Sequence, residues 1–167
     1  MGRVRLMRPR FVLNPPRGAV VEFAYSEALT EGRVSPWITL SAGESCNMDH
    51  YVARGGEQVF FPITPRGGRY LEVHVYAPPA KVHFIKQEIV DRHYFGKPEG
   101  SFQSNDSLLN KIWSVGVRTL RACSEDALID NPTRERGQWT GDVATVGMDI
   151  TASAFSDLPM SYLRQTP

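Results

Sequence analysis

Cysteine and histidine are scarce in this chain of 167 residues. The two cysteines, Cys46 and Cys123, lie far apart and form no C-x-x-C pair, so the sequence offers neither a disulfide framework nor a zinc site. The four histidines are scattered and form no H-E-x-x-H motif: His50, His74, His83 and His93. We therefore expect two free and mostly buried thiols, no bound metal and no cofactor.

The chain also lacks a strong net charge and long apolar runs. A formal net charge of +1 gives no general attraction to nucleic acid or to an anionic membrane, so neither is expected as a partner. There is no run of about 18 apolar residues and no signal-peptide core after Met1, so no membrane span is predicted and the cytoplasm is the default location. A local exception is a group of four arginines, for which a solvated terminus is the favoured interpretation: Arg3, Arg5, Arg8 and Arg10.

Residues 1 to about 98 carry the alternation that is typical of half-buried strands. In the first such segment Val21, Phe23 and Tyr25 fall on one face, with polar or small residues between them. Four segments show this pattern: 20–28, 57–64, 69–77 and 81–90. The RGG sequence at 66–68 is predicted to be the turn between two of them, because glycine reaches positive φ cheaply. Several short strands separated by Pro and Gly predict an antiparallel sandwich.

The period changes near residue 104. Ser104 or Asn105 can cap a helix, and residues 105–126 place apolar side chains at helical spacing. The predicted apolar stripe consists of Leu109, Ile112, Trp113, Gly116 and Leu120. A second helix is predicted at about 140–155, and a third begins near residue 156.

The stretch IDNPTRERGQWTGD, residues 129–142, connects the first two helices, and we call it the acid loop. Pro132 and Gly137 keep it from continuing the first helix, and its length exceeds that of most helix–helix links, which is often a sign of function. Its three acids, Asp130, Glu135 and Asp142, can converge on one point, with Asp142 in the first turn of the next helix.

The neighbours of these acids suggest sugar chemistry. Arg134 and Arg136 bracket Glu135, and a guanidinium holds a neighbouring carboxylate ionised, whereas burial against Trp139 favours the protonated form. Such opposed environments let one acid donate a proton while another stays charged, and glycosidic bonds are commonly cleaved by two carboxyl groups. The residues alone favour a plainer alternative, in which the aspartates are helix-end residues and Glu135 forms surface ion pairs of little energetic value.

At these positions the sequence resembles the bacterial α-L-rhamnosidases, inverting glycoside hydrolases with an (α/α)6-barrel catalytic domain. The family's loop has the form D-x-P-x-R-E-x-x-x-W-x-G-D, and residues 130–142 match its spacing throughout, with Asn131 where many relatives have Cys. Residues 105–126 resemble the first barrel helix, and GAVVEFAYSEAL, GGEQVFFP and RGGRYLEVHV resemble the preceding β-sandwich. The resemblance implies a partial, jelly-roll-like β-sandwich at 1–98, lacking early strands, and the truncated start of a helical barrel at 99–167.

The resemblance also implies roles for individual residues. Glu135 aligns with the general acid that protonates the leaving glycosidic oxygen. Asp130 and Asp142 align with acids that hold the rhamnose hydroxyls, Trp139 with the apolar wall of the subsite, and Arg134 with a support for the acids. The implied partners are rhamnose-containing glycans or glycosides.

Inversion also needs a general base across the sugar, with the two carboxyl groups about 6.5–9.5 Å apart. In the family this base comes from much later in the barrel, and Asp149 and Asp157 have no matching context. We therefore expect a fragment that carries the acid but not the base and is inactive alone. The alternative is a non-catalytic module, a carbohydrate-binding or self-associating β-sandwich, whose open strand edges and apolar helix face predict homo-oligomers.

Overall fold

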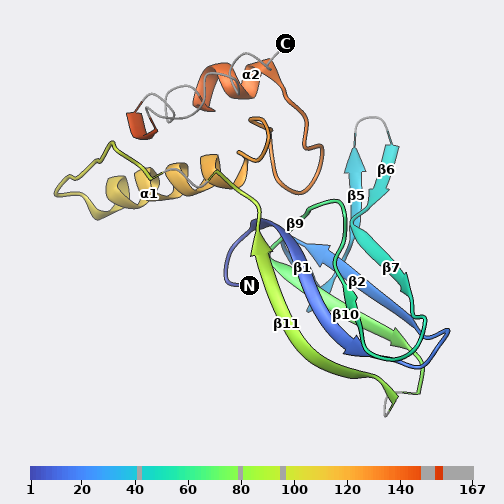
Figure 1. The fold of residues 1–167 in the computed structure, drawn as a ribbon. Coiled ribbons are helices and arrows are strands. Elements are labelled where there is room, and N and C mark those ends of the chain that lie inside the picture. Colours follow the sequence, from blue (N-terminus) through green and yellow to red (C-terminus); the bar gives the residue numbers. More distant parts are fainter. Residues whose placement is uncertain (41–42, 79–80, 95–96, 148–152, 156–167) are drawn as a thin grey trace. The chain divides into compact units, whose positions relative to one another are not determined.

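The computed structural model describes residues 1–40, 43–78, 81–94, 97–147 and 153–155 (Figure 1). The chain divides into two compact units, Met1–Arg92 and His93–Pro167. The first unit is built of antiparallel strands and the second contains the helices, which confirms the predicted fold class. The predicted domain ranges, 1–98 and 99–167, stay a prediction.

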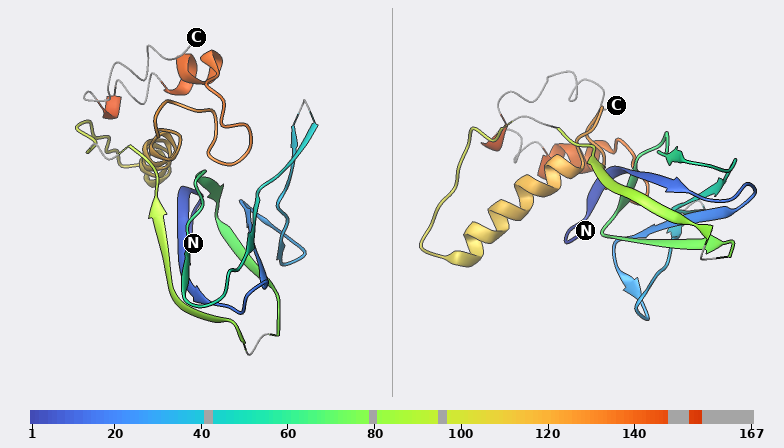
Figure 2. Two further views of the ribbon diagram at one scale, coloured as in Figure 1. Left: turned by 45° about the vertical axis from the view of Figure 1, so that its right-hand side comes forward. Right: turned by 60° about the horizontal axis from the view of Figure 1, so that its bottom comes forward.

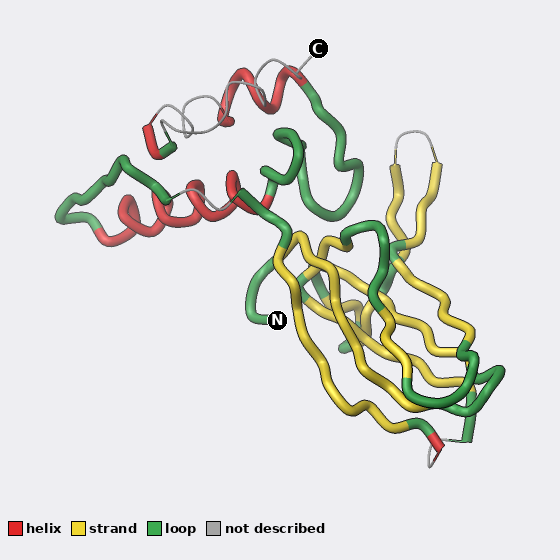
Figure 3. Tube along the Cα trace, in the orientation of Figure 1, coloured by secondary structure: helices red, strands yellow, loops and turns green. Residues whose placement is uncertain are grey.

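Eleven strands make up the first unit in the part of the chain that the structure describes, and Figure 3 shows them in yellow. They are β1 (Arg5–Asn14), β2 (Val20–Ser26), β3 (Leu29–Thr30), β4 (Arg33–Val34), β5 (Trp37–Leu40), β6 (Gly43–Cys46), β7 (Met48–Val52), β8 (Gln58–Phe60), β9 (Arg66–Gly68), β10 (Tyr70–Tyr76) and β11 (His83–Asp91). One sheet has the order β11-β1-β8, with β9 also paired to β1, and another has the order β10-β2-β7. The remaining strands form two hairpins, β3–β4 and β5–β6.

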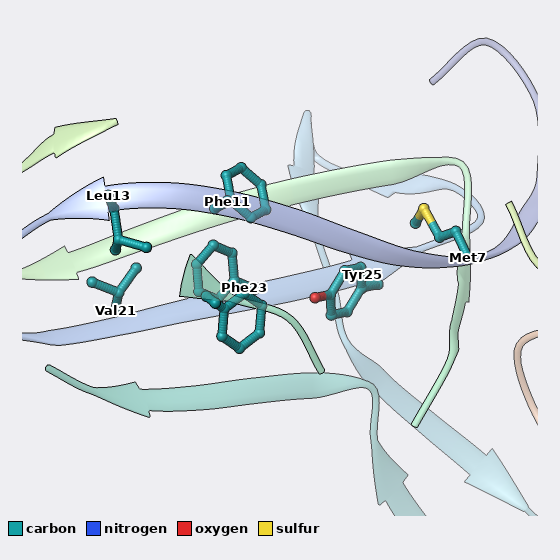
Figure 4. Close-up of a cluster of buried hydrophobic side chains, with 7 residues drawn as sticks. Met7, Phe11, Leu13, Val21, Phe23 and Tyr25 are labelled. Atoms are coloured by element: carbon teal, nitrogen blue, oxygen red, sulfur yellow. The ribbon is translucent and has the colours of Figure 1, made fainter. Parts of the chain in front are cut away.

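The core of this unit lies between residues of β1, β2 and β8 (Figure 4). The ring of Phe23 stacks on that of Phe60 with centroids 4.0 Å apart, and the ring of Phe11 lies 4.8 Å from that of Phe23. Val21, Phe23 and Tyr25 are fully buried, so the predicted inner face of β2 is confirmed. The predicted face of β10 is confirmed as well, since Leu71, Val73 and Val75 pack against this cluster.

A polar network accompanies the core. The Tyr25 hydroxyl donates to Asp49 Oδ2 at 2.9 Å, and Arg66 Nε donates to the same carboxylate at 3.1 Å. Burial, together with the negative charge of Asp49, raises the pKa of Tyr25. The network ties β7 and β9 to β2, because buried Asn47 also donates to the carbonyl of Gly67 at 2.8 Å.

The prediction of a solvated terminus was wrong for Arg5, Arg8 and Arg10, which lie in β1, whereas Arg3 precedes the strand and is exposed. From Arg8 onward, the even positions of β1 are partly or fully exposed and alternate with buried Pro9, Phe11 and Leu13, whereas Leu6 and Met7 are both buried. Arg5 pairs with Asp91, and Arg10 Nη1 lies 2.7 Å from Glu88 Oε2. Arg8 Nε donates to the carbonyl of Pro62 at 2.7 Å. The sequence pattern did not indicate this strand, because arginines stand where a solvated segment would also have them. In the fold, each of the three guanidinium groups has a partner from another strand or loop.

The RGG sequence is also not a turn. Residues 66–68 form β9, which pairs with β1 so that Gly68 lies opposite Arg5. The glycine is explained by close approach, since a Cβ on Gly68 would lie 3.1 Å from the carbonyl oxygen of Ser26.

In the part of the second unit that the structure describes, the long helix is α1 (Ser107–Ala122), which runs without interruption (Figure 2). Its N-cap is Asp106 rather than Ser104 or Asn105, and Asp106 Oδ1 accepts from the N–H of Leu108 at 2.7 Å. Ser104 instead exchanges two hydrogen bonds with the side chain of Asn110, at 2.8 and 2.9 Å. The start of the helix is therefore held by side chains on both sides of the cap.

The predicted apolar stripe of α1 is only partly covered. Leu120 is buried with Val117, but Leu109 and Ile112 are 46% and 58% exposed. The buried cluster of this unit consists of Val117, Leu120, Leu128, Val143, Ala154 and Phe155, with Tyr94 and Trp113 packed against it.

The second helix begins at the predicted place. It consists of a single turn, α2 (Thr140–Asp142), that continues into the π-helical segment η2 (Val143–Gly147). Residues 148–152, and the predicted third helix from residue 156, lie outside the described residues.

Candidate functional site

Backbone hydrogen bonds close the acid loop at its base. The N–H of Ile129 donates to the carbonyl of Cys123 at 2.9 Å. Asp130 and Gly137 then face each other: the N–H of Asp130 donates to the carbonyl of Gly137 at 2.9 Å, and the N–H of Gly137 donates to Asp130 Oδ1 at 2.8 Å. The seven-residue separation of this pair sets the size of the loop, so Asp130 is part of the loop's own framework.

Asn131 turns the chain inside this framework. Its Oδ1 accepts from the N–H groups of Thr133 and Arg134, at 3.1 and 2.6 Å, which is the hydrogen-bonding pattern of an Asx turn. Its Nδ2 donates to the carboxylate of Asp130. The adjacent Pro132 is buried and has no N–H to satisfy. Asn131 therefore stabilises the conformation of the loop, a role that needs no reactive side chain.

The structure brings Glu135 together with Trp139 and Arg134. The indole Nε1 of Trp139 donates to Glu135 Oε2 at 2.8 Å, and Arg134 Nη2 lies 3.2 Å from Glu135 Oε1. The Glu135 side chain is 26% exposed, while that of Arg134 is 54% exposed. Trp139 is itself 54% exposed, so its contact with Glu135 is made through the polar N–H rather than by burial under the ring.

Asp142 lies in α2, the third residue of that single turn, and is exposed. Within the described part of the chain, the hydrogen bonds and ion pairs of Glu135 and Asp130 given above do not include Asp142. The convergence of the three acids on one hollow therefore stays a prediction.

Arg136 has a different partner from the one that its position suggested. It does not bracket Glu135: its Nη2 lies 3.0 Å from Glu125 Oε2, and the two side chains are 26% and 12% exposed. Its backbone is left-handed, with φ at 52°. The spacing of the motif did not indicate Glu125, because this residue lies in the turn after α1, outside the acid loop.

No group of three His, Cys, Asp or Glu side chains that could hold a metal ion occurs among residues 1–40, 43–78, 81–94, 97–147 and 153–155. Both cysteines are free thiols, and burial raises the pKa of Cys46. Within the same described ranges, no helix combines the length and the apolar character needed to cross a membrane.

Comparison with known proteins points to one family. Residues 97–160 match the family model described as the bacterial alpha-L-rhamnosidase six-hairpin glycosidase domain. No curated protein sequence matches the chain. Among solved structures, the chain is similar to the GH78 family rhamnosidase of Bacillus sp. GL1, with a TM-score of 0.75 and 28% identity over 92% of this chain.

Two further solved structures are similar. The α-L-rhamnosidase of Aspergillus terreus aligns with a TM-score of 0.63 and 25% identity over 85% of this chain. The rhamnosidase of Klebsiella oxytoca with rhamnose bound aligns with a TM-score of 0.75 over 93% of this chain, and at 20% identity it supports the fold alone. The chain spans 16% of the Bacillus and Aspergillus chains and 32% of the Klebsiella chain. These matches confirm the predicted resemblance over part of the length of those enzymes.

Proposed function

We propose that this chain, a partial relative of the bacterial α-L-rhamnosidases, carries the general-acid side of an inverting α-L-rhamnosidase active site. The observation that supports the proposal best is the arrangement of Glu135, whose carboxylate is held between Trp139 and Arg134 in a loop with the spacing of the family's motif. The reaction class is hydrolysis of terminal α-L-rhamnosyl residues in rhamnose-containing glycans or glycosides.

Glu135 is the proposed general acid, and its two oxygens are not equivalent. Oε2 accepts from the indole N–H of Trp139 at 2.8 Å, whereas Oε1 faces the exposed guanidinium of Arg134 at 3.2 Å. Exposed ion pairs are weak, so a glycosidic oxygen can displace Arg134 at Oε1 more easily than it can displace the indole at Oε2. The proton would therefore be delivered from Oε1, while Trp139 fixes the orientation of the carboxyl group.

The remaining loop residues would bind the sugar. Asp130 accepts from the Gly137 N–H and from the amide of Asn131, and a carboxylate with about four lone-pair sites retains capacity for a rhamnose hydroxyl. Asp142 is exposed on α2, so its carboxylate is accessible to a second hydroxyl. The exposed ring of Trp139 offers an apolar surface to the C–H groups of the deoxy-sugar.

A polypeptide of these 167 residues is expected to bind rhamnose without hydrolysing rhamnosides. Inversion needs a second carboxylate that activates water on the opposite face of the sugar, and the resemblance assigns no residue of this chain to that role. With an aryl rhamnoside as substrate, the purified wild-type chain should release no more rhamnose than the Glu135→Gln variant releases. Turnover that depends on Glu135 would refute the expected inactivity.

Sugar binding provides the direct test. Titration with L-rhamnose, followed by NMR or calorimetry, should show binding that is lost in Trp139→Ala and weakened in Glu135→Gln. Trp37→Ala is the matched control, because Trp37 is also exposed, at 68%, but belongs to the first unit. Binding that survives Trp139→Ala unchanged would refute the assignment of the sugar site to the acid loop.

The alternative function is a non-catalytic β-sandwich that binds carbohydrate or associates with itself. It is favoured by the large apolar side chains that the first unit exposes, among them Ile63 at 91% and Trp37 at 68%. The edge strand β11 adds Ile85 and Ile89, exposed at 56% and 41%. Rhamnose binding that is abolished by Trp37→Ala but not by Trp139→Ala would select this function. A clean monomer in sedimentation at high concentration would count against self-association.

A further inference from the structure

We propose that Glu125 and Arg136 are positioning residues, whose ion pair holds the acid loop in the conformation that orients Glu135 and Trp139. The importance of this role for sugar chemistry rests on the proposed function, but the positioning itself can be measured without a sugar.

Arg136 occupies the least favourable backbone conformation of the loop. Its φ of 52° lies in the left-handed region, which residues other than glycine rarely adopt and retain only when their surroundings impose it. The residue on each side is already engaged: Glu135 accepts from Trp139, and the N–H of Gly137 donates to Asp130. A change of the backbone conformation at residue 136 would therefore displace both contacts.

Glu125 provides the fixed end of the pair. It follows Ser124, which is fully buried and whose Oγ donates to the carbonyl of Leu120 in α1 at 2.6 Å. Ser124 also forms a bridge with Leu128, so the turn that carries Glu125 is closed on itself and attached to the helix. At 12% exposure, the Glu125 side chain is better shielded from solvent than Arg136, Glu135 or Arg134.

Packing transmits the position of residue 136 to the indole. Gly137 lies so close to Trp139 that an added Cβ would be 2.7 Å from Nε1 and 3.1 Å from Cε2. The indole therefore rests on the backbone that follows Arg136, and its N–H reaches Glu135 Oε2 from that position. A continuous series of contacts therefore leads from Glu125 through Arg136, Gly137 and Trp139 to Glu135.

The indole N–H of Trp139 reports on this arrangement. The full chain contains three tryptophans, Trp37, Trp113 and Trp139, so its 15N-labelled form gives three indole signals. The signal that is lost in Trp139→Phe is that of Trp139. Glu125→Ala and Arg136→Ala should each move the Trp139 signal toward that of a free indole and make its hydrogen exchange about tenfold faster. The Trp113 and Trp37 signals should stay in place, which shows that both units remain folded.

Two further variants separate positioning from general stabilisation. Arg136→Gly should retain the wild-type Trp139 signal, because glycine adopts the left-handed conformation without strain and no longer needs the ion pair. In the double variant Glu125→Ala with Arg136→Ala, the Trp139 signal should be displaced no further than in either single variant, because each substitution removes the same ion pair. Glu88→Ala, which breaks the Arg10–Glu88 pair of the first unit, is the control that should leave the signal unchanged.

The proposal is overturned if the Trp139 signal and its exchange rate do not respond to Glu125→Ala and Arg136→Ala, or if Arg136→Gly loses the signal as completely as Arg136→Ala does. Titration with L-rhamnose is a separate arm of the experiment. A responsive indole in a chain that does not bind rhamnose would support the positioning pair and refute the proposed function. Rhamnose binding with an unresponsive indole would do the reverse.

Discussion

Removing the ring of Phe23 tests whether the aromatic cluster stabilises the first unit. Phe23 is fully buried at the centre of the cluster, where it stacks on Phe60 at 4.0 Å and contacts Phe11 at 4.8 Å. Phe23→Ala leaves a space that the rings of Phe11 and Phe60 cannot fill completely, because each of these rings is held in another strand. The lost transfer free energy and the remaining cavity together are expected to lower the free energy of unfolding by about 3–5 kcal/mol.

This loss is large for a unit of this size. The 92 residues from Met1 to Arg92 would ordinarily have a free energy of unfolding of about 5–14 kcal/mol. Phe23→Ala should therefore lower the urea midpoint of the first unit by about a fifth of its value or more, and it should speed hydrogen exchange of the β2 amides by about two to four orders of magnitude.

Urea denaturation followed by far-UV circular dichroism, with hydrogen exchange of β2 as the local probe, measures the effect. Val59→Ala is the matched control, because Val59 lies beside Phe60 on β8 but is 46% exposed, and its truncation should cost less than about 1 kcal/mol. Phe23→Leu should give an intermediate value of about 1–2 kcal/mol. A loss below about 1 kcal/mol for Phe23→Ala would show that the ring is not a core element and would refute the packing described here.

The remaining predictions concern a glycine, a carboxylate and a helix cap. Gly68→Ala should lower the free energy of unfolding by about 1–3 kcal/mol, because its Cβ would meet backbone atoms of β2, whereas Gly141→Ala, with open space around it, should be neutral in the same denaturation assay. The hydrogen bond from Arg33, and next that from the N–H of Val34, lower the pKa of Glu72 from 4.5 to about 2. The stabilising contribution of Glu72 is therefore complete above pH 4.5 and is lost as the pH falls toward 2. In an acid titration, Glu72→Gln should lose less stability over this range than the wild type, and identical acid profiles would contradict the prediction. Asp106→Ala should reduce the helicity of α1 and destabilise the second unit by about 1 kcal/mol, and unchanged helicity by circular dichroism would show that the cap is dispensable.

Local patterns predicted the elements whose residues face one core. The alternation of Val21, Phe23 and Tyr25 was sufficient to place a strand and its buried face, because a strand repeats every two residues and one side must be apolar. The same reasoning missed β1, in which arginines take the outward positions and a proline lies inside the strand. It also misassigned residues 66–68, because glycine occurs both in turns and in strands that lie very close to a neighbouring strand, and the sequence does not distinguish the two.

The candidate site shows the same division. The spacing of Asp130, Arg134, Glu135 and Trp139 was visible in the sequence and predicted that an acid, a guanidinium and an indole would meet, as they do at Glu135. A cytoplasmic location and the roles of these residues in catalysis stay predictions.

The sequence by itself determined the strand and helix periods, the length of the acid loop and the residue types within it, because these depend on neighbours only a few positions apart. The tertiary structure alone decided that Arg136 pairs with Glu125 rather than Glu135, that Asp130 closes the loop on Gly137, and that Gly68 lies against β2. The physical reason is that a charged or hydrogen-bonding group takes whichever partner the folded backbone brings within about 3 Å. That choice depends on how distant segments pack, and residue spacing along the chain does not specify it.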